Sequence, residues 1–204
     1  LHKAIRRQRQ MCIRDRLYCC VAGLPAPFAA VHLLFINLLT DSLPALAIGM
    51  ESVDERLLQD TPRDPSEKLL NSSFIRNMLI YGSMIAAVTI TAFYLGDPVH
   101  TVQTAMTMAF ATLTLARLFH GFNLRSKYSL VRIGLCSNRW SIAAFGVGVL
   151  LLVLVLCIPA ARSAFAASSL TGAQTASVAV LAGLPTIIIQ GFRILRERLS
   201  GTDR

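Results

Sequence analysis

Residues 140–158 have the sequence Trp140-Ser-Ile-Ala-Ala-Phe-Gly-Val-Gly-Val-Leu-Leu-Leu-Val-Leu-Val-Leu-Cys-Ile158, a run of nineteen positions without a charged side chain. Because an α-helix rises about 1.5 Å per residue, such a run crosses a hydrocarbon core roughly 30 Å thick. Four further segments are similarly apolar, namely 29–50, 74–95, 102–122 and 176–192. Backbone groups in lipid must be hydrogen-bonded within their own segment, so all five should be helices. The sequence predicts an all-α integral membrane protein with five transmembrane helices.

The composition excludes most other classes of protein. Of the 204 residues, 54% are hydrophobic and 15% are charged, whereas soluble domains carry about 25% charged residues. The net charge of +9 does not indicate nucleic acid, because the basic residues flank the apolar segments, where they set topology and contact lipid headgroups. We therefore expect the lipid bilayer, and no nucleic acid, as a partner. The five cysteines lack the spacing of a disulfide framework or a zinc site.

The connections between the spans alternate in charge. Segments 51–73, 123–139 and 193–204 each carry several basic residues, whereas 96–101 has none and 159–175 has only Arg162. By the positive-inside rule the basic segments are cytoplasmic. The chain is thus predicted to be a multi-pass protein of a cell membrane, and its alanine-rich spans and short loops favour a bacterial plasma membrane.

The N-terminal segment does not fit this topology. Residues 1–16 hold six basic groups and should be cytoplasmic, yet the span 29–50 should begin outside. Only 17–22 is apolar between them, which is too short to cross. We expect a fragment in which 1–22 is foreign or the remnant of a missing helix, 23–199 is the membrane domain and 200–204 is a tail.

Three oxygen-bearing side chains lie close together in the first span. Asn37, Thr40 and Asp41 stand at i, i+3 and i+4, which is one face of a helix. A carboxylate at this depth costs about 2.5–3.5 kcal/mol and needs a partner. Oxygen ligands suit a hard cation such as calcium, and Pro44 should open the helix near Thr40. The alternative is an Asp41 that only hydrogen-bonds across the bundle.

The third span contains a second intramembrane charge, Arg117. It either faces the bundle interior as a fixed counter-charge to Asp41, or extends to the cytoplasmic interface five residues away. For His32 and His120 we favour packing or interfacial positions over metal ligation. The sequence contains no phosphate-binding glycine loop and no catalytic triad order, so no residue is predicted to be catalytic or cofactor-binding.

The stretch His32-Leu-Leu-Phe-Ile-Asn-Leu-Leu-Thr-Asp-Ser-Leu-Pro-Ala-Leu-Ala-Ile-Gly-Met50 closely resembles the sixth membrane helix of calcium-type P-type ATPases. Residues 23–28 resemble the outer loop before that helix, and 61–67 resemble a proline-arginine-proline segment of the next cytoplasmic loop. Segment 107–110 and the helix exit at 122–123 resemble the eighth helix. The resemblance covers residues 21–199 and is strongest over 23–67.

This resemblance implies that Asn37, Thr40 and Asp41 occupy cation-coordinating positions. Ser42 replaces the family's usual glycine, and Arg117 replaces an acidic ligand of members with two calcium sites, which implies one transported cation per cycle. The phosphorylation, nucleotide-binding and actuator domains precede this region in the family. ATP and magnesium would therefore bind only in those missing domains, the missing N-terminal part of the pump would be a partner, and this chain alone would not be an enzyme.

Two further alternatives stay open at this point. Manganese or a monovalent cation could be transported in place of calcium, because oxygen ligands do not name the ion. A different class of function is a freestanding five-helix accessory or assembly protein, in which Asp41 and Arg117 form a structural ion pair.

Overall fold

The computed structural model describes residues 21, 28–40, 42–50, 72–124, 130 and 138–200. Its regular elements are all helices: α2 (Ala30–Phe35), the π-helix η1 (Ile36–Thr40), α3 (Ser42–Gly49), α4 (Ser72–Leu95), α5 (Val102–Leu124), α7 (Arg139–Cys157), α8 (Pro159–Ala164) and α9 (Gly172–Ser200). The all-α prediction is confirmed over this part of the chain. The basic segment predicted over 1–22, apart from residue 21, lies outside the described residues, as do Asp41, the loop 51–71 and the tail from 201 onward.

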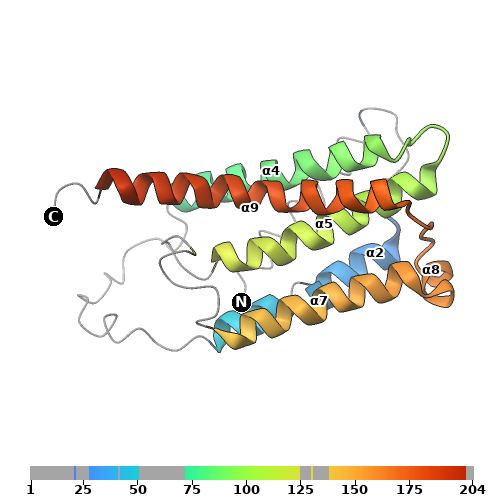
Figure 1. Ribbon diagram of the computed structural model, residues 1–204, viewed down its shortest axis with the longest axis horizontal. Helices are drawn as coiled ribbons and strands as arrows, with labels where there is room; N and C mark the ends of the chain where they lie inside the picture. The colour runs from blue at the N-terminus through green and yellow to red at the C-terminus, as the bar shows by residue number, and fades with distance from the viewer. Residues whose placement is uncertain are drawn as a thin grey trace.

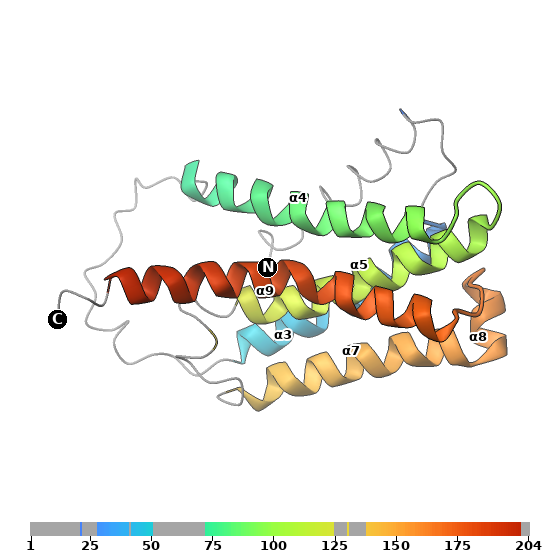
Figure 2. The ribbon, with the colours of Figure 1, turned by 45° about the horizontal axis from the view of Figure 1, so that its top comes forward.

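The long helices run side by side in one bundle (Figure 1). The connection between α4 and α5 lies at the same end as α8, and these are the nearly uncharged connections that the positive-inside rule predicts to be outside. Figure 1 shows α5 with α4 and α9 on one side and the first span and α7 on the other, and in the turned view of Figure 2 α9 crosses in front of α5. Helix α5 contacts α3, α4, α7 and α9.

Helix α5 is the most enclosed element of the bundle because small residues line it. Ala105, Ala109 and Ala111 are completely buried, and small side chains let helix backbones approach closely in membranes. On its neighbours, Gly96 lies so near α5 that a Cβ atom there would be 2.4 Å from the Cα atom of Ala105, and a Cβ atom on Gly148 would be 2.6 Å from the side chain of Leu118. At Gly96 the neighbouring atoms belong to the backbone, so this contact requires glycine, whereas at Gly148 the Leu118 side chain would have to shift.

Four parts of the structure are long and apolar enough to cross a membrane: Ala30–Ala47, Ile75–Leu95, Arg139–Cys157 and Gly172–Leu199. The fifth predicted span is α5, which has 23 residues and is therefore also long enough. It is less apolar than the others because it carries four threonines, Arg117, His120 and Asn123. These polar residues are accommodated because α5 is covered by other helices.

Two spans differ from their predicted extent. The last was predicted over 176–192, but α9 has 29 residues, since its polar first turn and its arginine-rich end continue the helix beyond the apolar stretch. The first was predicted as one helix over 29–50 and is divided into α2, η1 and α3. The short helix α8 was not predicted; Pro159 occupies its first turn, where proline is tolerated.

Candidate cation site

The first span changes its helical geometry where the candidate ligands lie. Helix α2 passes into the π-helix η1 at Ile36, whose amide bonds the carbonyls of His32 and Leu33. Pro44 cannot donate a hydrogen bond to the carbonyl of Thr40, four residues earlier. The predicted departure from a regular helix near Thr40 is thus observed, as a wider turn. Short π segments are rare and are frequently found at functional sites.

The structure brings two of the three predicted ligands into this segment. Asn37 is the second residue of η1 and its side chain is exposed on the bundle surface, whereas Thr40 is the last residue of η1. Asp41 lies outside the described residues. Among the residues that the structure describes, no three His, Cys, Asp or Glu side chains form a group that could hold a metal ion. Because its side chain is exposed, Asn37 faces away from the other described helices.

Arg117 lies on α5 and is only 6% exposed. Helix α5 also contacts η1, so the arginine belongs to the helix that packs on the candidate segment. This burial favours an interior position over extension to the interface. Its relation to Asp41 stays a prediction, because Asp41 is not among the described residues.

The start of the first span is anchored by aromatic packing. His32 is completely buried, which confirms the prediction that it packs. Its ring stacks on Phe110 of α5 with 4.5 Å between ring centroids, and its Nε2 lies 2.7 Å from the carbonyl oxygen of Phe165, just after α8. Phe35 contacts both phenylalanines edge-on. One cluster thus joins the first span, α5 and the segment after α8 at the end of the bundle where α8 lies.

A polar cluster at the other end of α5 was missed in the sequence. Asn123 donates to the hydroxyl of Thr186 at 3.1 Å and accepts from the amide of Gln190 at 2.6 Å, while Arg193 donates to the Asn123 backbone carbonyl at 3.0 Å. Thr186, Gln190 and Arg193 have the spacing i, i+4 and i+7, which places them on one face of α9. This spacing of polar residues along one helix face was the signal in the sequence that could have indicated a polar contact there. This cluster holds α5 to α9.

Asn138 was also missed, although an asparagine before an apolar run is a common helix start. Its side-chain oxygen accepts hydrogen bonds from the backbone amides of Trp140 and Ser141 and caps α7. Its amide group donates to the carbonyl of Ala47 at 3.1 Å. Asn138 therefore connects the start of α7 to the end of the first span.

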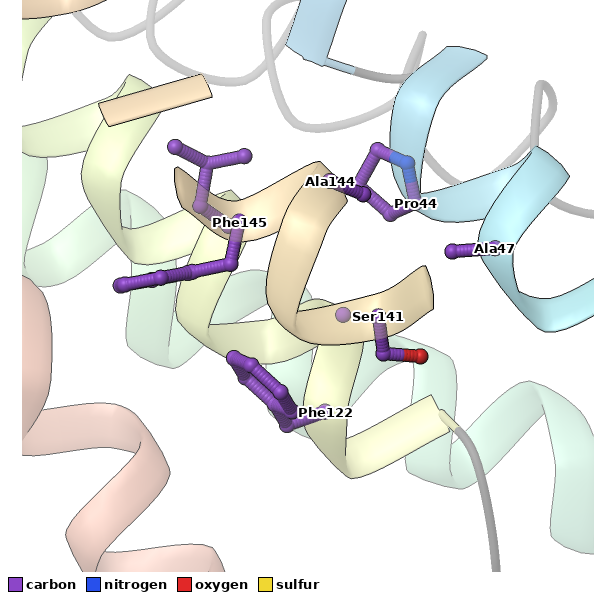
Figure 3. A pocket seen from close by; sticks show the side chains of 8 residues that line it. Pro44, Ala47, Phe122, Ser141, Ala144 and Phe145 are labelled. Carbon is purple, nitrogen blue, oxygen red and sulfur yellow. The ribbon is translucent and has the colours of Figure 1, made fainter. Parts of the chain in front are cut away.

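A small pocket, with a cavity volume of about 10 Å³, lies beside the first span (Figure 3). Pro44 of α3 lies beside Ala144 of α7 in this view, whereas the ring of Phe145 points away from α3 and contacts Phe122. Apart from Ser141, the lining side chains are apolar, so the pocket lacks the oxygen ligands that a hard cation needs. It is not the candidate cation site.

Taken together, the fold and the buried arginine define a polytopic helical membrane protein with a polar, irregular first span. Residues 25–195 match the family described as "Cation transporting ATPase, C-terminus". The chain belongs to this family, and the resemblance to calcium-type P-type ATPases is confirmed.

Its relatives include several proteins named for calcium transport. The chain is 29% identical to "Calcium-transporting ATPase 1" of Bacillus cereus over 193 residues, covering 86% of this chain and 22% of the relative. Identity to "Calcium-transporting ATPase 1" of Lactococcus lactis is 33%, covering 89% of this chain and 20% of the relative. Identity to the human "Calcium-transporting ATPase type 2C member 1" is 30%, covering 73% and 16%. The chain thus spans about a fifth of the length of the first two relatives.

Proposed function

We propose that this chain is the ion-binding membrane portion of an ATP-driven cation pump that exports calcium. The observation that carries the proposal is the π-helix η1, which holds Asn37 and Thr40 directly before Asp41 in a membrane span of this family. A wider turn leaves carbonyl oxygens available beside side-chain oxygens, and calcium takes six to eight oxygen ligands. The names of the relatives support calcium as the ion.

The exposed face of the first span supports a binding site that other helices complete. Asn37 lies on this face together with Leu34 and Leu38, which are 64% and 62% exposed. An amide group facing lipid is unfavourable unless it has a polar partner. We infer that further membrane helices of the pump cover this face and supply the remaining oxygen ligands. ATP and magnesium would bind in domains outside this chain.

Arg117 suggests how many ions are carried. A buried guanidinium on the helix that contacts η1 supplies one fixed positive charge near the site. Such a charge disfavours a second bound divalent cation by electrostatic repulsion, which is strong at low dielectric. We infer one transported cation per cycle, with Arg117 as the internal counter-charge to Asp41. A measured stoichiometry of two calcium ions per ATP in the intact pump would contradict this.

The test is ATP-dependent ⁴⁵Ca²⁺ uptake into inverted bacterial membrane vesicles that contain the protein expressed from its complete gene. Asp41→Asn should abolish uptake while the amount of protein and its thermal stability stay close to wild type. The matched control is Asp97→Asn, the same change at an exposed carboxylate in the connection between α4 and α5, which should leave uptake unchanged. Competition by manganese and sodium tests the identity of the ion.

The rival function, a freestanding accessory protein with a structural Asp41–Arg117 pair, predicts a different pattern. In that case Asp41→Asn and Arg117→Gln each lower stability by about 3–5 kcal/mol, because each leaves a buried charge without its partner. The double variant then recovers part of the loss. Normal calcium uptake by Asp41→Asn, or no ATP-dependent uptake by the wild type, would refute the pump proposal.

A further inference from the structure

His32 makes two hydrogen bonds, and together they indicate which of its ring nitrogens carries the proton. The backbone amide of Ala29 donates to Nδ1 at 3.3 Å, so Nδ1 carries no proton. Nε2 lies 2.7 Å from the carbonyl oxygen of Phe165, which only accepts, so Nε2 carries the proton and donates. The neutral ring therefore satisfies both nitrogens while it is stacked on Phe110. The hydrogen bond from Ala29 is local to the start of α2 and fixes the orientation of the ring, whereas rotation of α2 about its axis would break the bond to Phe165 and the stacking on Phe110.

These contacts matter because α2 has only six residues, and a helix of that length is unstable without tertiary contacts. Its inner side is formed by His32, Phe35 and the first residue of η1, Ile36, all of which are buried. The carbonyl of His32 also accepts the Ile36 amide at the point where η1 begins. His32 thus anchors the turn from which the π-helix starts.

The direction of Asn37 follows from this anchor. Asn37 is five positions after His32, which corresponds to about 140° around a helix of 3.6 residues per turn. The structure agrees, since the His32 side chain is buried and the Asn37 side chain is exposed on the opposite side of the span. Figure 1 shows that α2 begins near α8, at the end of the bundle that also holds the connection between α4 and α5. The anchor therefore lies at the end that the loop charges predict to be outside.

We propose that His32 is a positioning residue for the cation site: by linking the first span to α5 and to the segment after α8, it holds the side chain of Asn37 toward the helices that complete the site. This inference rests on the proposed function. The same segment after α8 is itself held to α5, because the Ser168 amide donates to the hydroxyl of Thr107 at 2.9 Å. The Phe165 carbonyl is therefore a stable attachment point for His32.

The test compares three variants in the same calcium-uptake assay, with the complete gene product. His32→Phe keeps the ring and its stacking but removes both hydrogen bonds, and His32→Gln keeps one donor and one acceptor. The matched control is His100→Phe, because the side chain of His100 is 79% exposed on the same end of the bundle. For His32→Phe the calcium concentration for half-maximal uptake should rise about tenfold, with the maximal rate retained. His32→Gln should stay within about threefold of wild type and His100→Phe should not change.

A milder variant keeps the inference testable if His32→Phe does not fold. Ala29→Pro removes only the amide that donates to Nδ1, and the φ of −73° at Ala29 suits proline. It should raise the half-maximal calcium concentration about threefold. The ¹⁵N chemical shifts of His32 in the wild-type chain should report a neutral ring protonated at Nε2.

The outcomes separate this inference from the proposed function. If Asp41→Asn abolishes uptake while His32→Phe and Ala29→Pro have the wild-type half-maximal concentration, His32 does not position the site and only this inference fails. A loss of stability and maximal rate without a change in the half-maximal concentration also overturns it, because the role is then purely structural. If Asp41→Asn leaves uptake intact, the proposed function fails and this inference falls with it.

Discussion

The first span and α5 solve the problem of polar groups in a membrane in opposite ways. The first span is divided into three short elements and exposes Asn37 beside leucines. Helix α5 is continuous over 23 residues, and three of its four threonines, Arg117 and His120 are buried within the bundle. Helix α5 is thus the element on which α3, α4, α7 and α9 pack. The first span instead leaves a face with Leu34, Asn37 and Leu38 exposed, which is where we infer that further helices pack.

The largest difference in stability should appear between two alanine variants: one at Gly96, which is packed against α5, and one at Gly49, at the end of the first span. Gly96→Ala would place a Cβ atom 2.4 Å from the Cα atom of Ala105 on α5, and this backbone cannot move aside, so we expect a loss of about 3 kcal/mol. Gly49→Ala, at the end of the first span, meets no atom within 4 Å and should change stability by about 1 kcal/mol or less. Unfolding by SDS in bicelles, followed by far-ultraviolet circular dichroism, measures both. Equal losses would show that α5 is not the tighter region.

A second pair of glycines tests how closely α7 approaches α5. A Cβ atom on Gly148 would lie 2.6 Å from a methyl carbon of Leu118, whereas one on Gly146 meets nothing within 4 Å. Gly146→Ala should stabilise the protein by about 0.5–1 kcal/mol through helix propensity. Gly148→Ala should be about 2 kcal/mol less stable than Gly146→Ala, because Leu118 must shift. The same SDS titration applies, and identical values for the two variants would contradict the close approach.

Removing the Asn138 side chain, which links α7 to the first span, should lower stability by a smaller amount. Asn138→Ala removes the cap of α7 and the hydrogen bond to the Ala47 carbonyl, so we expect a loss of about 1–2 kcal/mol. Asn138→Asp retains the capping oxygen but cannot donate to Ala47, and it should recover about half of that loss. Amide hydrogen exchange at the end of α3 should increase in both variants. Unchanged exchange there would mean that Asn138 caps α7 without supporting the first span.

The smallest expected effect is a pH dependence of stability that arises from Asp97, in the connection between α4 and α5. The backbone amide of His100 donates to the Asp97 carboxylate, and the His100 ring adds a second hydrogen bond. Together they hold the pKa of Asp97 below its ordinary value. A lowered pKa means that this contact stabilises the turn above the unfolded-state pKa, and that the stabilisation is lost as the pH falls through the folded-state pKa. His100→Ala removes the ring hydrogen bond but keeps the backbone amide, so carboxyl ¹³C titration should show the Asp97 pKa rising only part of the way toward its ordinary value. An unchanged pKa would show that the ring does not contribute and that the backbone amide alone lowers it.

The functional residues differ in how far they could be predicted. Asn37, Thr40 and Asp41 stand out because oxygen-bearing side chains are rare in an apolar span, and Arg117 stands out for the same reason. Asn123 and Asn138 did not, since a polar residue near a helix end is usual at a membrane interface. Their hydrogen bonds to Gln190 and Ala47 connect positions more than sixty residues apart, and local patterns carry no information about such pairs.

The sequence by itself determined the class of protein, because uncharged runs of about twenty residues have few other stable environments than a bilayer. It also predicts the side on which each loop lies and the residues of the candidate cation site. Only the tertiary structure decided that the first span contains a π-helix, that His32 joins this span to Phe110 and Phe165, and that Arg117 is enclosed. The reason is physical: hydropathy depends on each residue alone, whereas helix rotation and the direction of a side chain depend on which neighbouring helix offers a cavity, a ring or a carbonyl group.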